Sequence, residues 1–265
     1  MPTNHWTARI ARANALSVRH PAAADILRFY ARLAAHQQTL AAQWAGAPWD
    51  PPLVLSALPA TLELLARAGP PELARFVSAL RDAPIDNWAV TLDRYLAEDA
   101  FDAEDIPRAF VIEALLQPLA EACAGACPEH SRGAAPGQMP RHGNARADAR
   151  CPFCQQRPTT GVLRDAGHGT RRALVCGLCF TEWAFERIIC PSCGERRFDA
   201  LPVYTAEQFA GVRVDGCDSC GVYLKTIDAS QDGTSVPEVD DLATLTLDLW
   251  AREHGYRRLR ITFYL

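Results

Sequence analysis

Apolar residues recur at a helical spacing along the first 123 residues. Over residues 22–44 they fall close to the α-helical period, which predicts one long amphipathic helix. Shorter stretches of the same kind follow, separated by breaks at Gly46 and at Gly69-Pro70-Pro71. About five amphipathic helices joined by short breaks predict a helical bundle over residues 1–123. Pro118 is expected to kink or end the last of them.

Two other segments of this half lack that pattern. The first 24 residues carry Arg9, Arg12 and Arg19 without an acidic residue, which resembles a transit peptide weakly, and we expect a frayed N-terminus instead. Residues 124–150 are rich in Gly, Ala, Pro and Arg, and Met139 is their only large apolar residue. Such a composition buries too little apolar surface to offset its ordering entropy, so we expect a mobile linker.

The second half carries short stretches typical of β-strands. Residues 159–163 and 172–175 flank a Gly-rich turn and predict a hairpin. Residues 181–189 alternate as one strand. Residues 198–204 and 212–214 are expected to form a second hairpin, before a last strand at 223–227.

A closing helix is predicted over residues 237–254, with Pro237 in its first turn and Gly255 as its C-cap. Asp240 and Asp241 place favourable negative charge near its start. Lys225, the only lysine of the chain, is interpreted as an ordinary exposed strand residue. The expected buried stripe of the helix consists of Leu242, Leu245 and Leu249.

Eight cysteines of this half stand in four C-x-x-C pairs. A two-residue spacer lets two thiolates of one turn, here called a knuckle, reach one metal ion, and two knuckles make a closed tetrahedral site. The long separators, 155–175 and 194–216, fit a hairpin within one site, and 180–189 fits a connecting strand. We therefore expect two four-thiolate sites: Cys151, Cys154, Cys176 and Cys179 in the first, and Cys190, Cys193, Cys217 and Cys220 in the second.

The knuckles of the two expected sites differ in sequence. Gly194 and Gly221 follow the second cysteine of the third and fourth knuckles, where glycine tolerates a positive φ. Gln155 and Phe180 stand at the matching positions of the first and second knuckles. We expect the first site to be less regular and the second to contribute more folding energy through its metal.

Structural metal binding, with zinc or iron as the ion, is the preferred interpretation of these cysteines. A thioredoxin-like role requires a C-x-x-C that opens a helix in a βαβ pattern, which is absent here. A single iron that changes oxidation state among four thiolates is an alternative. Cys123 and Cys127, with His130 nearby, are interpreted as incidental rather than as a third site.

Charge and composition argue against several function classes. The formal net charge is −4, and residues 151–225 hold nine Arg or Lys against eight Asp or Glu, so a nucleic-acid-binding surface is not expected. We expect neither a secretory signal nor a membrane-spanning stretch, and reduced thiolates indicate the cytoplasm. With no nucleophile–base pair, carboxylate dyad or phosphate loop evident, we expect no enzymatic activity.

Several motifs resemble the FdhE family of formate dehydrogenase accessory proteins. They are residues 176–183 (CGLCFTEW), residues 217–225 (CDSCGVYLK) and residues 240–245 (DDLATL), and the tail Gly255-Tyr256-Arg257 continues the match. The resemblance extends from about Cys151 to Tyr256. Phe180 stands where the family usually has a small or glycine-type residue, and residues 261–263 replace its common Asn-Pro-Phe stretch.

The resemblance implies an α+β protein with a helical N-terminal domain (1–123), a linker (124–150) and two rubredoxin-like or zinc-ribbon modules (151–187 and 188–265), the second with a closing helix. The eight cysteines would hold two metal ions, iron or zinc. Thr181-Glu182-Trp183, Tyr223-Leu224-Lys225 and Asp240-Asp241 become candidates for domain packing or client contact.

The function implied by the resemblance is that of a cytoplasmic protein that assists maturation of a molybdenum- or tungsten-containing formate dehydrogenase. It would bind the catalytic subunit of that enzyme without oxidising formate itself. The alternatives are a rubredoxin-like redox protein and a nucleic-acid-binding zinc ribbon. A visible spectrum with reversible reduction would indicate the first, and salt-dependent binding of DNA or RNA the second.

Overall fold

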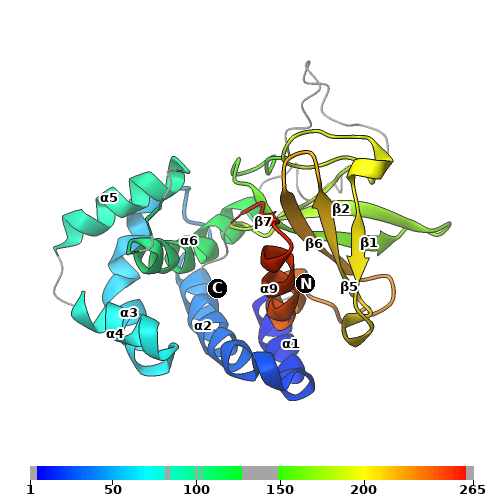
Figure 1. Ribbon diagram of the computed structural model, residues 1–265. Helices are drawn as coiled ribbons and strands as arrows, with labels where there is room; N and C mark the ends of the chain where they lie inside the picture. The colour runs from blue at the N-terminus through cyan, green and yellow to red at the C-terminus, as the bar shows by residue number, and fades with distance from the viewer. Residues whose placement is uncertain (1–4, 81–83, 99–100, 103, 127–148, 261–265) are drawn as a thin grey trace. The chain divides into compact units, whose positions relative to one another are not determined.

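A computed structural model describes residues 5–80, 84–98, 101–102, 104–126 and 149–260 of the chain. These residues fall into two compact units, one before and one after residues 127–148 in the sequence (Figure 1). Cys127, His130, most of the expected linker and residues 261–263 lie outside the described residues. The two units are presented separately.

The first unit is helical, as the apolar spacing predicts. Proline stands in the first turn of several elements, where its fixed φ suits a helix start and its missing N–H is not needed. The α-helices are α1 (His5–Arg19), α2 (Ala24–Gln43), α3 (Leu58–Ala68), α4 (Pro71–Ala79), α5 (Ile85–Leu96) and α6 (Ile106–Ala126), with 3-10 turns η1 (Pro21–Ala23) and η2 (Pro51–Ala57).

Helix α6 lies at the centre of this unit and packs against α2, α3, α4, α5 and η2. Pro118 lies inside the helix, which continues to Ala126, so the proline does not end it. Within the described part of the chain, α6 alone is long and apolar enough to cross a membrane, and 72% of its apolar window is buried. That burial is typical of a core helix.

Buried polar side chains attach the neighbouring helices to α6. Gln37 of α2 donates from Nε2 to the Ala114 carbonyl and to Gln117 Oε1, both at 2.8 Å. Tyr95 of α5 donates its hydroxyl to Glu113 Oε2 at 2.6 Å. Because a buried polar group without a partner is destabilising, these bonds specify how α2 and α5 sit on α6.

The expectation of a frayed N-terminus is wrong, because residues 5–19 form α1. Trp6, Ala13 and Leu16 are buried. Arg9 is also buried, with Nη1 2.6 Å from Glu121 Oε2 of α6 and its guanidinium 4.5 Å from the Trp6 ring centre. The acidic residue that pairs with this arginine is over a hundred residues away in the sequence. The composition of the first 24 residues therefore could not predict the pair.

The second unit is built on a mixed sheet with the order β3-β2-β1-β6-β5-β4, and β7 also pairs with β6. Both predicted hairpins form, although residues 198–200 are a 3-10 turn and the expected strand at 181–189 is paired only over 182–184. The strands are β1 (Pro158–Asp165), β2 (Thr170–Cys176), β3 (Glu182–Ala184), β4 (Val203–Thr205), β5 (Val212–Cys217), β6 (Val222–Asp228) and β7 (Arg257–Arg258).

Strands β1 and β6 run parallel and join the two cysteine-bearing segments into one sheet. Their register extends from Thr160 opposite Lys225 to Leu163 opposite Asp228. On one side β1 pairs with β2, and on the other side β6 pairs with β5, both antiparallel. Each hairpin therefore pairs, along its otherwise unpaired edge strand, with the edge strand of the other.

The expected closing helix is interrupted. Helices α8 (Pro237–Ala243) and α9 (Leu245–Glu253) meet at Thr244, whose φ of −115° and ψ of 36° are not helical. The break changes which positions face inward, so the expected stripe is wrong beyond Leu242. Leu249 is 50% exposed, and Leu247 and Ala251 are buried in its place.

The expectation that Lys225 is exposed is also wrong. It is fully buried, with Nζ 2.5 Å from Asp248 Oδ2 and 3.1 Å from Asp241 Oδ1. Arg258 reaches the same two carboxylates at 2.7 and 2.6 Å. Burial alone would raise the pKa of Asp241, but Arg258 and Lys225 hold it below its usual value. This buried ion network fastens α8, α9 and β7 to β6.

The Gly161→Ala substitution tests the β1–β6 pairing. A Cβ at Gly161 would lie 2.4 Å from Thr226 Oγ1, which is held by a hydrogen bond to Asp215 at 2.8 Å. We expect the free energy of unfolding of the second unit to fall by about 1–3 kcal/mol, measured by urea denaturation. Gly211→Ala is the control, because a Cβ there meets nothing within 4 Å. Equal effects of the two substitutions would contradict the role given to this pairing.

Candidate metal centres

The eight cysteines of the C-x-x-C pairs gather in two groups of four. Within each group the sulfur atoms all lie within 4.8 Å of one another. The first centre joins the first and second knuckles, and the second centre joins the third and fourth, as the separators predict. The first centre consists of Cys151, Cys154, Cys176 and Cys179, and the second of Cys190, Cys193, Cys217 and Cys220.

The sulfur–sulfur distances fit a shared ion. Three sulfur pairs of the first centre are 3.3–3.5 Å apart and two pairs of the second are 3.7–3.8 Å apart. A tetrahedral ion with metal–sulfur bonds of about 2.3 Å places its ligands about 3.8 Å apart. A disulfide would require about 2.05 Å. Both groups thus have the chemistry and approximate dimensions of a closed four-thiolate site.

The sheet positions both centres through strand ends. Cys176 is the last residue of β2, and the first knuckle lies just before β1, so the first centre sits at the open end of this hairpin. Cys217 is the last residue of β5, and the fourth knuckle turns the chain into β6. The segment after β3 brings the third knuckle to that turn. Each centre therefore closes one hairpin.

The knuckles share a pattern of backbone hydrogen bonds. In three of them the N–H of the first cysteine donates to the carbonyl five residues later, at 2.9 Å. The residue after the second cysteine donates back to the first cysteine's carbonyl in the first, third and fourth knuckles, at 2.8–3.0 Å. These bonds hold the two cysteines of a knuckle on one side of a tight turn.

The residue after the second cysteine has a positive φ in every knuckle. The values are 78° at Gly194, 67° at Gly221, 61° at Gln155 and 56° at Phe180. The predicted role of the two glycines is confirmed. The first centre uses the same turn with side chains that disfavour it, at a cost of roughly 1–2 kcal/mol for each residue. That is a physical basis for the expected difference between the centres.

Polar groups surround the sulfurs. The N–H groups of Leu178 and Ser192 point at Cys176 Sγ and Cys190 Sγ, each at 3.3 Å, and stabilise negative charge there. Thr181 Oγ1 lies 3.0 Å from Cys179 Sγ. Burial raises the pKa of the Cys190 thiol, whereas backbone N–H groups and a bound cation favour its ionised form.

Glu195 links the two knuckles of the second centre, a contact that the sequence analysis missed. Its carboxylate accepts from Ser219 Oγ at 2.7 Å and from the N–H groups of Arg196 and Arg197 at 2.9 Å. The Ser219 hydroxyl first, and then the two N–H groups, lower the pKa of Glu195 to about 2. No spacing rule in the sequence connects Glu195 with Ser219.

The other candidate residues make contacts within the second unit. Trp183 packs against a cluster that contains Leu174 and Leu224, and Glu182 pairs with Arg164 at 2.8 Å. The Tyr223 hydroxyl donates to Asp248 at 2.6 Å, inside the buried ion network. Among the described residues, Cys123 belongs to no group of three or more potential metal ligands. It is half-buried, and its sulfur donates to the Ala47 carbonyl at 3.6 Å.

Two domain models of one family match adjacent parts of the chain. The model described as the central domain of FdhE matches residues 150–187, and the model described as the C-terminal domain of FdhE matches residues 188–265. Residues 150–265 thus carry the central and C-terminal domains of the FdhE family. The predicted resemblance is confirmed, and both centres lie within the matched residues.

Curated relatives agree over the same region. An FdhE homologue of Aquifex aeolicus is 32% identical over 114 residues, one of Edwardsiella ictaluri 36% over 115, and FdhE of Escherichia coli 32% over 118. Each alignment covers 43% of this chain but only 37–40% of the relative. The crystal structure of FdhE from Pseudomonas aeruginosa matches with a TM-score of 0.73 and 25% identity, covering 100% of this chain and 97% of that one. The predicted α+β fold class is thereby confirmed.

One pair of substitutions tests the strain assigned to the first centre. Gly194→Ala should lower the free energy of unfolding by roughly 1–2 kcal/mol, because an alanine there must adopt a positive φ. A Cβ at Gly194 meets nothing within 4 Å, so no clash adds to this effect. Gln155→Ala, at the matching position, should change stability little because the strain is already present. Guanidinium denaturation of the zinc-saturated protein measures the free energy of unfolding of both variants. Equal losses of stability would contradict the strain assigned to the first centre.

Proposed function

We propose that this chain assists the maturation of formate dehydrogenase and is needed for its activity, acting as an accessory protein that binds the catalytic subunit. The observation that carries the proposal is membership of the FdhE family over both cysteine centres. The structural likeness to the Pseudomonas aeruginosa protein extends it over the helical unit. The accessory role itself is what the resemblance of the sequence motifs to this family implies.

The eight cysteines are proposed to bind two metal ions, zinc or iron, with a structural role. Four thiolates around one ion leave no coordination position open for a substrate, which is typical of structural sites. The strand ends and turns that carry the knuckles would be held together by the ion. The chain accordingly needs no catalytic residues of its own, and we propose that it is not an enzyme.

The cytoplasm is the proposed location. The sulfurs of both centres are spaced for an ion and not for disulfides, an arrangement that requires a reducing compartment. We propose domain limits of 1–123, 151–187 and 188–265. Each cysteine centre is then one module, although the two modules share one sheet.

A rubredoxin-like redox function is the second candidate. The N–H groups directed at Cys176 and Cys190 fit it, because such bonds stabilise an iron–thiolate centre as well as a zinc one. An iron form with a visible spectrum that bleaches and recovers on reduction and reoxidation supports this candidate. A colourless zinc protein that is fully active in complementation excludes it.

Metal content tests the two centres. The protein purified without chelators should hold about two zinc-plus-iron equivalents, one for each four-thiolate site, by elemental analysis. Cys154→Ser and Cys193→Ser should each remove about one equivalent. Cys123→Ser is the matched control and should retain both, because its sulfur lies outside the two groups. One equivalent or none in the wild-type protein at full occupancy contradicts the two-site proposal.

Gene deletion tests the function. Loss of the gene should abolish formate dehydrogenase activity while the catalytic subunit is still synthesised, and the purified protein should oxidise no formate. Activity is measured in extracts and the subunit by immunoblotting. Wild-type and Cys123→Ser genes should restore activity, whereas a gene with all eight centre cysteines replaced should not. Undiminished activity in a deletion strain without a second copy rules the proposal out.

A further inference from the structure

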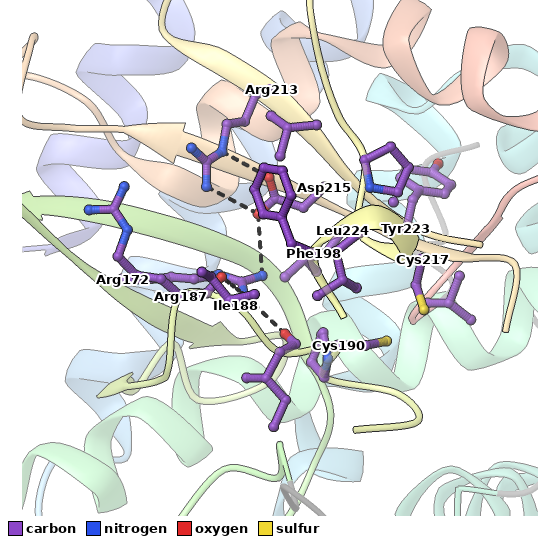
Figure 2. Close-up of a pocket in the computed structure, with 17 residues that line it drawn as sticks. Arg172, Arg187, Ile188, Cys190, Phe198, Arg213, Asp215, Cys217, Tyr223 and Leu224 are labelled. Atoms are coloured by element: carbon purple, nitrogen blue, oxygen red, sulfur yellow. Dashed lines mark hydrogen bonds and ion pairs between the residues drawn. The ribbon is translucent and has the colours of Figure 1, made fainter. Parts of the chain in front are cut away.

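We propose that a small pocket beside the second centre docks an extended segment of the client polypeptide, one that carries an apolar side chain next to an Asp or Glu. This inference rests on the proposed function, since the client is the formate dehydrogenase catalytic subunit. The pocket lies entirely in the second unit, between the segment after β3, the η3 turn (Phe198–Ala200), β4 and β5 (Figure 2).

Exposed apolar side chains gather at this pocket. Eight large hydrophobic residues are exposed among those the structure describes, and three of them line it: Ile188 at 52%, Phe198 at 79% and Val203 at 53%. They come from three different segments of the chain. An exposed apolar cluster assembled in this way, rather than scattered single residues, marks an interaction surface.

The size of the pocket favours a side chain over a small molecule. Its volume is about 80 Å³. Pockets that hold cofactors or drug-sized ligands have about 300–1,000 Å³. Cys190 and Cys217 of the second centre form part of its wall, so its shape depends on that knuckle pair. A hollow of this size with an apolar rim suits one anchoring side chain of a peptide that lies across it.

The charge of the pocket favours an acidic neighbour for that anchor. Figure 2 shows Arg172 and Arg213 directed at one carboxylate, Asp215, with nitrogen–oxygen distances of 3.3 and 2.8 Å. Arg172 is 3% exposed, and its Nε has no hydrogen-bond partner among the described residues. Arg187, at the rim, contacts Thr170 through Nη1. Arg172 and Arg213 therefore share one carboxylate, whereas Arg187 forms no ion pair with an acid among the described residues and leaves an exposed guanidinium beside the apolar cluster.

The same charge argues against a second copy of this chain as the occupant. A two-fold interface places a surface patch against itself. Here that would bring two sets of arginine side chains together with two acids between them, and like charges in contact are unfavourable. A carboxylate on a different polypeptide complements the guanidinium groups through short charged hydrogen bonds.

Binding of the purified, cofactor-free catalytic subunit to the metal-loaded protein tests the inference. Replacing both Ile188 and Phe198 with Ser should weaken binding about tenfold or more, because exposed anchors of this kind carry much of an interface's affinity. Arg187→Glu should weaken it as well, and more strongly at low salt. Leu249→Ser and Arg252→Glu are matched controls, exposed and outside the pocket lining, and should bind as wild type does.

The outcomes separate this inference from the proposed function. If the wild-type protein binds the subunit and the pocket variants bind it equally well, the pocket is not the docking site, although the function stands. If the wild-type protein does not bind the subunit, the proposed function itself fails. Metal content and thermal unfolding of each variant should match wild type, because the altered side chains are exposed.

A peptide array identifies the chemistry of the segment. Overlapping 15-residue peptides of the catalytic subunit should yield binders that place an apolar residue beside an Asp or Glu. Exchanging that acid for Lys should abolish binding to the wild-type protein and restore it to Arg187→Glu. Binders without an acidic residue overturn the proposal. So does self-association, or nucleic-acid binding, that is lost in the Ile188 and Phe198 variant.

Discussion

The parallel pairing of β1 with β6 is the constraint on which the second unit depends. Neither cysteine hairpin is a complete sheet, and each has an unpaired edge that the other covers through the residues from Thr160 to Leu163. Gly161 has no side chain, so Thr226 can lie against β1. Each half contributes only three strands to the main order of the sheet, of which β3 and β4 are paired over three residues each, so the parallel pairing adds interstrand hydrogen bonds that a knuckle pair alone does not provide.

Strand β6 carries this arrangement to the rest of the unit. Lys225 points into the buried ion network, where Asp241, Asp248 and Arg258 come from α8, α9 and β7. Removal of one member of such a network leaves a buried charge without its partner, a loss of about 3–5 kcal/mol. Several residues of the motifs that resemble the FdhE family lie in this network. These motifs therefore include residues that hold β6 in place as well as residues that bind metal.

The sequence predicts what depends on local spacing. The cysteine pairing, the strands around it and the glycines at positive φ follow from two-residue spacers, alternation and backbone freedom. The errors share a different cause. Some errors concern residues that meet only after folding, as for buried Lys225, the Arg9–Glu121 pair and the Glu195–Ser219 hydrogen bond. The buried face of α9 depends on the helix break at Thr244, where the sequence has no proline or glycine to indicate it. The docking pocket likewise combines three segments without a shared motif.

Helix α6 has the length and hydropathy of a membrane span, yet it is the last helix of its unit to leave the ribosome. All its packing partners, from α2 to α5, precede it in the chain. Because domains fold as they are synthesised, a surface that can cover α6 is available when it emerges. The order of the helices along the chain thus shortens the time during which this long apolar segment is exposed.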